Sequence, residues 1–319
     1  MGETEKRTSS EGGLLARLFA PLVEALEPAI ETAVGEDPFG HDPDFVRSIL
    51  PLLRAADRYF GTELRGWDHV PESGPFLLVA NHSGGAVPFD PWPFYLRWVE
   101  ERGAETPLYS LTYDLDFSYP VIGPRLRRMG MIPASHENAR RAFERGAPVL
   151  VFPGGDHEVF RPWSERNRID FGGRKGFLRL ALSAGVPIIP MTIHGAHEST
   201  FVLTRGSELA RRGGLDKLHI KVLPFIWSIP FGPTLGAIPT VQLPAKVTVQ
   251  LGESIAWPEL DAEAASDDEV LERCYEEVTG TMQAALDELA KEDPYPILTR
   301  LNELRPLPAL ARAWRSRRA

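Results

Sequence analysis

Apolar and polar positions follow two different periods along this 319-residue chain, and these periods predict its elements. Short apolar runs of strand length recur between residues 76 and 251, and segments with helical spacing lie between them. The predicted strands are 76–80, 107–113, 148–152, 187–193, 218–223 and 246–251. The predicted helices among them are 91–102, 136–145 and 174–184. This alternation predicts an α/β fold with a mixed, largely parallel sheet flanked by helices.

Amphipathic helices are expected on both sides of this region. A first one, over residues 14–30, packs on the main domain or lies flat on a membrane, and its few basic residues favour packing. A second is expected over 43–60, and a strongly charged one over 267–291 covers the domain. We therefore divide the chain into an N-terminal tail with amphipathic helices (1–60), a main α/β domain (61–260), and a C-terminal helix with a basic tail (261–319).

Composition narrows the class of protein. The formal net charge of −9 argues against non-specific binding of nucleic acid, which needs a basic face. The single cysteine, Cys274, excludes an internal disulfide and fits a reducing compartment, and its place in a helical apolar stripe predicts a buried structural thiol. No signal peptide and no uninterrupted apolar stretch of about 18 residues is recognisable, so we expect a cytoplasmic protein without a spanning helix.

Two short motifs follow predicted strands. Asn81-His82-Ser83-Gly84-Gly85 comes after 76–80, and Phe152-Pro153-Gly154-Gly155 comes after 148–152. Open α/β sheets place their chemistry at the carboxyl ends of strands. A histidine there exchanges a proton near neutral pH, and an acid such as Asp90 orients it. Such a pair activates a hydroxyl, a thiol or water, although in isolation a His and an Asp in one loop are more often structural.

Four blocks in order resemble the glycerolipid acyltransferase family, nearest its diacylglycerol acyltransferase-like branch. The first runs from Asn81 to Asp90, and the second is Arg128-Met129-Gly130-Met131-Ile132-Pro133-Ala134-Ser135. The third is Phe152-Pro153-Gly154-Gly155-Asp156-His157-Glu158, and the fourth is Val186-Pro187-Ile188-Ile189-Pro190-Met191. The resemblance covers roughly residues 60 to 255 and implies the fold of that family.

The resemblance implies direct acyl transfer without a covalent intermediate, a metal or a cofactor. His82 would be the general base on a lipid hydroxyl, oriented by Asp90, and the donor would be acyl-CoA or acyl carrier protein. Backbone amides around Gly84 and Gly85, or Gly154 and Gly155, would stabilise the oxyanion. The expected substrate-binding residues lie in these motifs or are nearby cations: Asn81, Ser83, Gly84, Gly85, Pro153, Gly154, Gly155, Glu158, Arg161, Arg174 and Lys175.

The chain departs from the family pattern in three places. Seven residues separate His82 from Asp90, more than is usual in the family. The third block has paired glycines with the later acid Glu158. The second block continues with Ser135 and His136 where the family often carries an arginine that grips an acceptor phosphate. We therefore favour an uncharged acceptor, such as a mono- or diacylglycerol or a long-chain alcohol.

The cations near these blocks keep an acidic acceptor open at this stage. Arg140, Arg161, Arg174 and Lys175 are all candidates to bind the phosphates of CoA or of an acidic acceptor. Placement on the surface, without a ligand, is the ordinary alternative for each of them.

Residues 222–245 carry no charge, and five prolines rule out a continuous helix. We expect an irregular apolar segment that forms a membrane-facing patch or a wall for an acyl chain, with ordinary core loops as the alternative. Without a spanning helix, the protein is expected to be peripheral or monotopic at the inner face of the membrane. The membrane contact would come from helix 14–30, this segment or the arginine-rich tail at 305–319.

Two other sequence patterns are weak evidence for a functional site. His194 and His197 lack the spacing of a metal site and are expected to line a pocket or make structural bonds. The stretch Gly252-Glu253-Ser254-Ile255-Ala256 nearly matches a nucleophile elbow but follows the last predicted strand. The alternatives to an acyltransferase are a non-catalytic lipid-binding protein of the same fold and an acyl-thioesterase.

Overall fold

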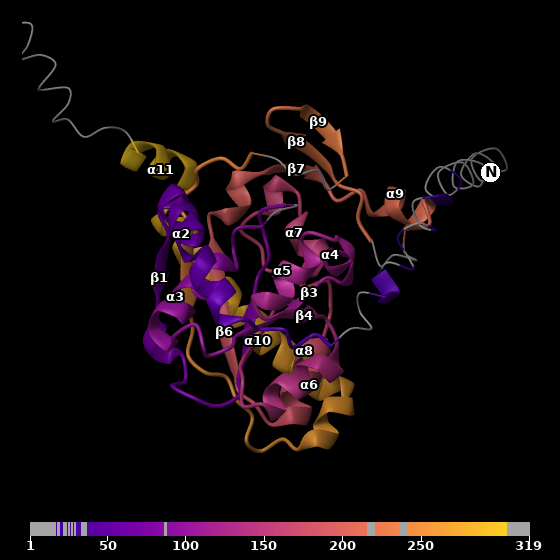
Figure 1. The fold of residues 1–319 in the computed structure, drawn as a ribbon, viewed down its shortest axis with the longest axis vertical. Coiled ribbons are helices and arrows are strands. Elements are labelled where there is room, and N and C mark those ends of the chain that lie inside the picture. Colours follow the sequence, from indigo (N-terminus) through magenta and orange to yellow (C-terminus); the bar gives the residue numbers. More distant parts are fainter. Residues whose placement is uncertain are drawn as a thin grey trace, which may run out of the picture.

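The computed structural model describes residues 37–85, 88–215, 221–236 and 241–304, together with single positions between 17 and 32. Its centre is a seven-stranded sheet with the order β1-β10-β6-β2-β5-β3-β4 (Figure 1). Every neighbouring pair is parallel except β10 with β6. The strands are β1 Glu63–Arg65, β2 Leu77–Ala80, β3 Tyr109–Thr112, β4 Met131–Pro133, β5 Val149–Val151, β6 Ile188–His194 and β10 Thr248–Leu251. The predicted α/β fold with a mixed, largely parallel sheet is confirmed.

Helices cover both faces of the sheet, because successive side chains of a strand point to opposite sides. Leu77 and Val79 of β2 join the core under α6, α8 and α10, whereas Leu78 and Ala80 join the core under α2 and α3 (Figure 1). All four of these side chains are buried, as expected for a central parallel strand. These helices are α2 Pro43–Phe60, α3 Trp92–Arg102, α6 His136–Glu144, α8 Gly176–Ala184 and α10 Asp268–Glu292.

The long predicted helices are confirmed within a few residues. Helix α2 has the predicted bounds because Asp42 caps its first turn and Gly61, in the left-handed region, ends it. Cys274 is buried in the apolar stripe of α10, as predicted. Four short helices have too few turns to show a period: α4 Asp114–Ser118, α5 Gly123–Arg128, α7 Gly155–Val159 and α9 Ser207–Arg212. Helix α11 Pro296–Leu304 was not predicted either, although it is as long as α6 and α8. The 3₁₀ turns are Trp67–His69, Trp163–Glu165, Ala196–Ser199 and Ala262–Ser266.

A second, antiparallel sheet follows the carboxyl end of β6 and lies at the top of Figure 1. Its strands are β7 Phe201–Thr204, β8 Phe225–Ser228 and β9 Gly232–Leu235. The prediction of an irregular segment over 222–245 is therefore wrong for β8 and β9. The predicted strand 218–223 is also wrong where the structure describes it, because 221–223 lie outside any strand. The prolines are accommodated because Pro230 lies in the turn and Pro233 on an edge strand.

Parts of the predicted membrane contacts lie outside the described residues. This applies to residues 305–319, to 237–240 and to most of helix 14–30. Of that helix, Leu26 and Ile30 are described, and they pack partly buried against Ala210 and Leu215. Among the described residues, no helix combines the length and the apolar character needed to cross a membrane.

Candidate active site

The two sequence motifs meet at one edge of the sheet, because β2 and β5 are parallel neighbours. His82 lies two residues after β2, and Phe152 lies directly after β5. Their ring centroids are 4.4 Å apart, so Phe152 forms an apolar wall beside the imidazole. The sequence placed Phe152 in the motif but not among the site residues, although its position directly after a strand could have indicated it.

His82 and Asp90 form a hydrogen-bonded pair in spite of the long loop between them. The distance from His82 Nδ1 to Asp90 Oδ2 is 2.8 Å, and the same oxygen accepts the amide of Ser83 at 2.7 Å. Asp90 is fully buried, whereas the imidazole is 17% exposed. A carboxylate oxygen accepts hydrogen bonds, so this contact keeps the proton of the neutral imidazole on Nδ1 and leaves Nε2 able to accept one.

A buried ion pair holds the backbone of His82 from both sides. The amide of His82 donates to Glu158 Oε2 at 2.8 Å, and Arg161 Nη1 donates to the carbonyl of His82 at 2.6 Å. Glu158 Oε1 lies 3.5 Å from the same Arg161 nitrogen, and both side chains are almost fully buried. The sequence analysis placed Glu158 and Arg161 among the substrate-binding residues. In the structure they contact the protein backbone instead, and we call them the His82 clamp.

Burial affects the charge of this clamp. It raises the pKa of Glu158 to about 7, against the opposing attraction of Arg161 and of the amide of His82. It also lowers the pKa of Arg161, although an arginine stays protonated in proteins. The clamp therefore places a titrating carboxyl group in hydrogen-bond contact with the backbone amide of His82, the candidate base.

Asn81 and Ser83 have structural contacts. Asn81 donates from Nδ2 to the carbonyl of Ile193 at 2.9 Å and accepts the amide of Ile193 at 2.7 Å, which fixes the motif to strand β6. Both Asn81 and Ser83 are fully buried. These two predicted substrate-binding residues thus position the loop in this structure.

The glycines after His82 bring the second sheet close to the loop. The carbonyl of Gly84 accepts from Gln242 Nε2 at 2.8 Å and from Thr200 Oγ1 at 3.4 Å. Gly84 and Gly85 have φ angles of 94° and 75°, which side chains rarely adopt. A Cβ on Gly85 would also lie 3.2 Å from Thr200, so this approach requires glycine.

The third block wraps around Arg174. This arginine donates from Nη1 to the carbonyl of Gly154 at 2.8 Å and from Nη2 to Asp156 at 2.7 Å, and a longer contact joins it to the carbonyl of Pro153. A Cβ on Gly154 would lie 2.5 Å from the Cβ of Glu158, so glycine allows the clamp residue to reach His82. Gly155 opens helix α7, which carries Glu158.

The predicted phosphate-binding cations are paired with acids. Arg174 contacts Asp156, and Lys175 makes an ion pair with Glu272. Two further arginines near the clamp are paired as well: Arg166 with Glu198 at 3.0 Å, and Arg205 with Glu165 at 2.9 Å. Arg140, on α6, is paired with Glu137 and Glu144. A phosphate would have to displace a carboxylate at each of these positions.

Asp116 was missed by the sequence analysis. It lies on α4, just beyond the carboxyl end of β3, and burial raises its pKa to about 6 while the attraction of His82 opposes the shift. Tyr113 lies in the same region, and burial together with Asp156 and Asp116 raises its pKa above the usual value. Two acids directly after a strand, Asp114 and Asp116, were the available signal. This side of the site is therefore acidic.

His194 and His197 make structural bonds. His194 Nε2 lies 2.8 Å from the carbonyl of Asp293, and His197 Nε2 lies 2.9 Å from that of Arg161. Burial lowers the pKa of His197 well below its usual value. In the part of the chain that the structure describes, no group of His, Cys, Asp and Glu side chains could hold a metal ion.

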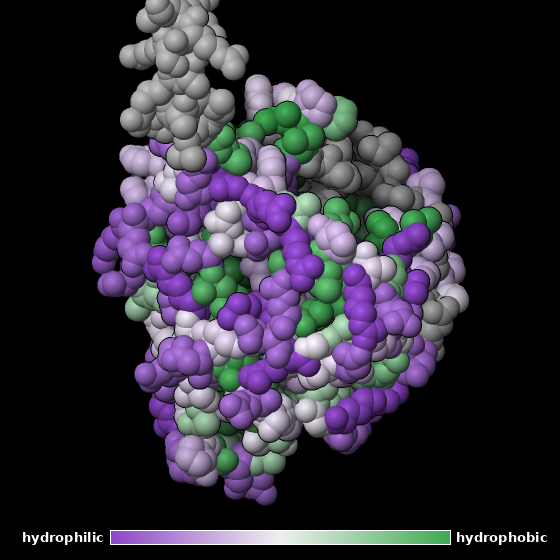
Figure 2. All heavy atoms as spheres, turned by 60° about the vertical axis from the view of Figure 1, so that its left-hand side comes forward, coloured by the Kyte–Doolittle hydropathy of each residue, from purple (hydrophilic) through white to green (hydrophobic). Residues whose placement is uncertain are grey.

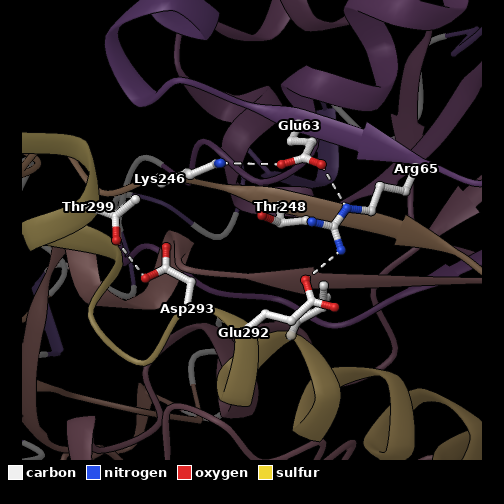
Figure 3. A pocket seen from close by; sticks show the side chains of 8 residues that line it. Glu63, Arg65, Lys246, Thr248, Glu292, Asp293 and Thr299 are labelled. Carbon is white, nitrogen blue, oxygen red and sulfur yellow. Dashed lines mark hydrogen bonds and ion pairs between the residues drawn. The ribbon is translucent and has the colours of Figure 1, made fainter. Parts of the chain in front are cut away.

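A polar pocket lies at the β1 edge of the sheet and is separate from the His82 pair (Figure 3). Its volume is about 180 Å³, below the range of about 300–1,000 Å³ that is usual for ligand pockets. Its cations are paired inside it: Arg65 with Glu63 and Glu292, and Lys246 with Glu63 (Figure 3). This pocket therefore has no part in the candidate site.

Known proteins resemble this chain along most of its length. Residues 61–194 match the protein family described as Acyltransferase. An uncharacterized protein of Mycobacterium tuberculosis is 32% identical over 287 residues, or 89% of this chain and 78% of that protein. A human protein named DGAT1/2-independent enzyme synthesizing storage lipids is 28% identical over 66% of this chain and 58% of its own length. Phytyl ester synthase 2 of Arabidopsis thaliana is 26% identical over 42% of this chain and 20% of its own length.

A crystal structure of the 1-acyl-sn-glycerophosphate acyltransferase PlsC from Thermotoga maritima is a more distant match. It is 18% identical with a TM-score of 0.46, over 89% of this chain and 97% of that one, and such a distance fixes nothing about the site. The family match, by contrast, runs from before β1 to the end of β6 and contains the His82–Asp90 pair and the clamp. The chain therefore belongs to the acyltransferase family, and it is an O-acyltransferase.

Proposed function

We propose that this protein transfers a fatty acyl group from a thioester donor to the hydroxyl of an uncharged lipid, with His82 as the general base. The observation that carries the proposal is the 2.8 Å contact between His82 Nδ1 and a buried Asp90, which leaves Nε2 of the partly exposed imidazole able to accept a proton. General-base help of this kind contributes about 10²–10⁴-fold to a rate.

The proposed reaction has two proton transfers and no covalent enzyme intermediate. His82 Nε2 takes the proton of the acceptor hydroxyl, whose oxygen attacks the thioester carbonyl. A C–O bond forms, the C–S bond breaks, and the leaving thiolate takes the proton from His82. Backbone amides of Gly84, Gly85, Gly154 or Gly155 are the proposed donors to the oxyanion. Because the thioester supplies the activated acyl group, no metal or cofactor is required.

Three observations support an uncharged acceptor. The cations near the site are engaged by carboxylates, among them Arg174 by Asp156. The carboxyl group of Asp116 lies beyond the carboxyl end of β3 and interacts electrostatically with His82, so it would repel a phosphate at the site. Ser135, which stands where the family often has a phosphate-binding arginine, caps helix α6 by accepting the amide of Asn138. The relatives named for storage lipids and phytyl esters agree with such an acceptor.

The location follows from the substrate. A lipid acceptor resides in a membrane, so we propose a peripheral protein that works at a membrane surface, with the cytoplasmic face as the source of acyl-CoA or acyl carrier protein. Neither donor is favoured by a particular side-chain contact.

The test is to incubate wild type and His82→Ala with labelled acyl-CoA and a set of acceptors, and to separate the products by mass. The acceptors are glycerol 3-phosphate, lysophosphatidate, mono- and diacylglycerol, and a fatty alcohol. We expect an acylated neutral lipid that disappears with His82→Ala, while the variant keeps the melting temperature of wild type. The same reactions are repeated with acyl carrier protein as the donor.

The other outcomes separate the alternatives. Wild-type turnover in His82→Ala would exclude His82 as the base. Free acid as the sole product would identify a thioesterase, and absence of turnover with both donors would favour a lipid-binding protein. A product formed only from lysophosphatidate or glycerol 3-phosphate would overturn the uncharged acceptor.

A further inference from the structure

The second sheet has an apolar face that no described residue covers. Along β8, buried and exposed side chains alternate, so Ile226 and Ser228 point inward while Phe225 and Trp227 point outward. Trp227 is 52% exposed, and Leu235, which pairs with Phe225 from β9, is 50% exposed. The turn between the strands adds Ile229 and Phe231, the latter 64% exposed. We call Phe225, Trp227, Ile229, Phe231 and Leu235 the hairpin face.

This face is connected directly to the catalytic loop. Strand β7 begins seven residues after β6, whose carboxyl end lies at the same edge as that of β2. Thr200, just before β7, contacts the carbonyl of Gly84, and the amide of Leu243 donates to the carbonyl of Ser199. Any partner that binds the hairpin face is therefore held close to the His82 loop.

Further exposed apolar side chains lie at this edge of the main sheet. One group, Tyr119, Val121 and Ile122, follows α4 at the carboxyl end of β3. Another is on α11, which is joined to the start of β10 by the bond from the Lys246 amide to the carbonyl of Pro296. Its members are Tyr295, Leu298, Leu301 and Leu304. Figure 2 shows apolar side chains at the upper end of the molecule, where Figure 1 places β8 and β9.

The composition of the hairpin face favours lipid over a protein partner. No charged residue occurs between Val222 and Ala245. Protein interfaces surround their apolar centre with a polar rim and form about one hydrogen bond per 100–200 Å². The exposed strand positions here offer apolar side chains and proline, with the indole N–H of Trp227 as the one side-chain donor of the hairpin face. Tryptophan and phenylalanine beside aliphatic residues are the side chains that enter the headgroup region of a bilayer.

We propose that the hairpin face inserts into a lipid bilayer and holds the His82 loop against the membrane surface, so that the acceptor reaches Nε2 without leaving the lipid phase. The proposal rests on the proposed function for the identity of the partner. The binding itself depends on apolar contact, so it needs no anionic lipid.

Flotation with vesicles tests this docking without any turnover. The full chain, the double variant Trp227→Ser/Phe231→Ser and the control Leu52→Ser are mixed with phosphatidylcholine vesicles, with and without phosphatidylglycerol. Leu52 is 69% exposed on α2 and is not part of the hairpin face, so the control removes an exposed apolar side chain from another element. We expect wild type and Leu52→Ser to float with both vesicle types. We expect the partition coefficient of the double variant to be lower by about tenfold or more.

Two further measurements keep the result decisive. Thermal melting shows whether the double variant is folded, which we expect because both side chains are exposed. Its turnover with a dispersed short-chain acceptor should match wild type, while turnover with an acceptor in vesicles should fall. Wild-type flotation by the double variant overturns the proposal. The proposal is also overturned if wild type does not float but forms a dimer that the double variant does not form. Lack of acylated product with normal flotation would refute the proposed function and leave the docking intact.

Discussion

At the scale of single residues, His82 is fixed through its ring and through its peptide. Asp90 binds the ring and the next amide, and the clamp of Glu158 and Arg161 binds the amide and the carbonyl of His82 itself. Three of these groups are charged and buried, so each depends on the hydrogen bonds that it makes here. The position of the base is therefore set by residues from two separate segments, the loop that ends at Asp90 and the helix α7 with the residues that follow it.

Asp90→Asn should lower kcat by about 10²–10⁴-fold. The carboxylate oxygen that contacts His82 Nδ1 also accepts the amide of Ser83, so an asparagine cannot replace it in full. If the NH₂ group takes this position, it faces the Ser83 amide and moves the imidazole proton to Nε2, where it blocks proton uptake. If the amide oxygen takes it, the negative charge that stabilises the imidazolium is lost. Steady-state kinetics, with the acceptor that the product test of wild type selects, measure the effect. Unchanged thermal melting confirms that the fold is kept. A loss of less than about tenfold would mean that another group orients His82.

Asp116→Asn should change the pH dependence of stability. Burial raises the pKa of Asp116 from 3.8 to about 6, so the folded state holds this proton more tightly than the unfolded chain. Its contribution is present below about pH 4 and is lost as the pH rises through about 6. The unfolding free energy of wild type relative to Asp116→Asn should therefore fall by up to about 3 kcal/mol between pH 4 and pH 7.

Urea denaturation across this pH range measures that difference. Asp68→Asn is the control, because the side chain of Asp68 is 87% exposed and should give little slope. A difference between wild type and Asp116→Asn that rises with pH would contradict the burial of an isolated carboxyl group.

At the scale of elements, the short helix α7 couples strand β5 to the catalytic loop. It begins at Gly155 and carries Glu158 towards His82, while Arg161 follows at its end. Its position depends on Gly154, where a side chain would collide with Glu158. Strands β2 and β5 thus form the edge of the sheet that carries the His82 loop, and α7 supplies the polar contacts that orient this loop.

Removing one partner of the clamp should cost more stability than removing both. Glu158→Gln or Arg161→Met alone leaves a buried charge without its counterpart and should destabilise the fold by about 3–5 kcal/mol. The double variant should recover most of this stability, because no unpaired charge is left. Its kcat should stay about 10- to 100-fold below wild type, since the His82 carbonyl has lost its donor and the base is displaced.

The split between kcat and KM distinguishes positioning from substrate binding. We expect KM to change little in the stable double variant, because neither buried side chain meets the substrate. A higher KM with normal kcat would assign the clamp to substrate binding, as the sequence first suggested.

At the scale of the whole molecule, charge is arranged so that cations near the site are neutralised and acids remain beside it. The protein carries nine net negative charges, and the arginines near His82 form ion pairs with neighbouring segments. The exposed apolar side chains gather at the same edge of the main sheet. Together these features fit an uncharged, membrane-borne acceptor.

Asp156→Asn should shift acceptor preference towards a phosphate. The substitution removes the carboxylate that contacts Arg174 at 2.7 Å and leaves the guanidinium able to bind an anion. The ratio of kcat/KM for lysophosphatidate to that for monoacylglycerol should rise by about tenfold, equal to about 1.4 kcal/mol. Competition assays with both acceptors measure this ratio, and Asp156→Asn/Arg174→Met should lack the gain. An unchanged ratio would mean that Arg174 does not reach the acceptor.

The pairing of Arg174 and Lys175 could not be predicted from the sequence. Arg174 and Asp156 are 18 residues apart, and Lys175 meets Glu272 from a different part of the chain. Arg140 and Arg161 differ from these two, because their partners lie three or four residues away on the same helix or directly beside it. For Arg174 and Lys175, only the folded backbone brings the acid close, which changes them from candidate phosphate ligands into internal ion pairs.

The sequence by itself determined five of the seven strands of the main sheet, its long helices and the position of the His82 and Gly154 motifs directly after strands, whereas the edge strands β1 and β4 were not predicted. These follow from local periods and from the rule that parallel strands end at a common edge. Tertiary structure alone decided the His82 clamp, the buried contact of Asn81 with Ile193, and the electrostatic interaction of Asp116 with His82. It also turned residues 225–235 into a hairpin with one apolar face. Short strands and buried ion pairs have no local pattern, because their energy comes from partners that only folding supplies.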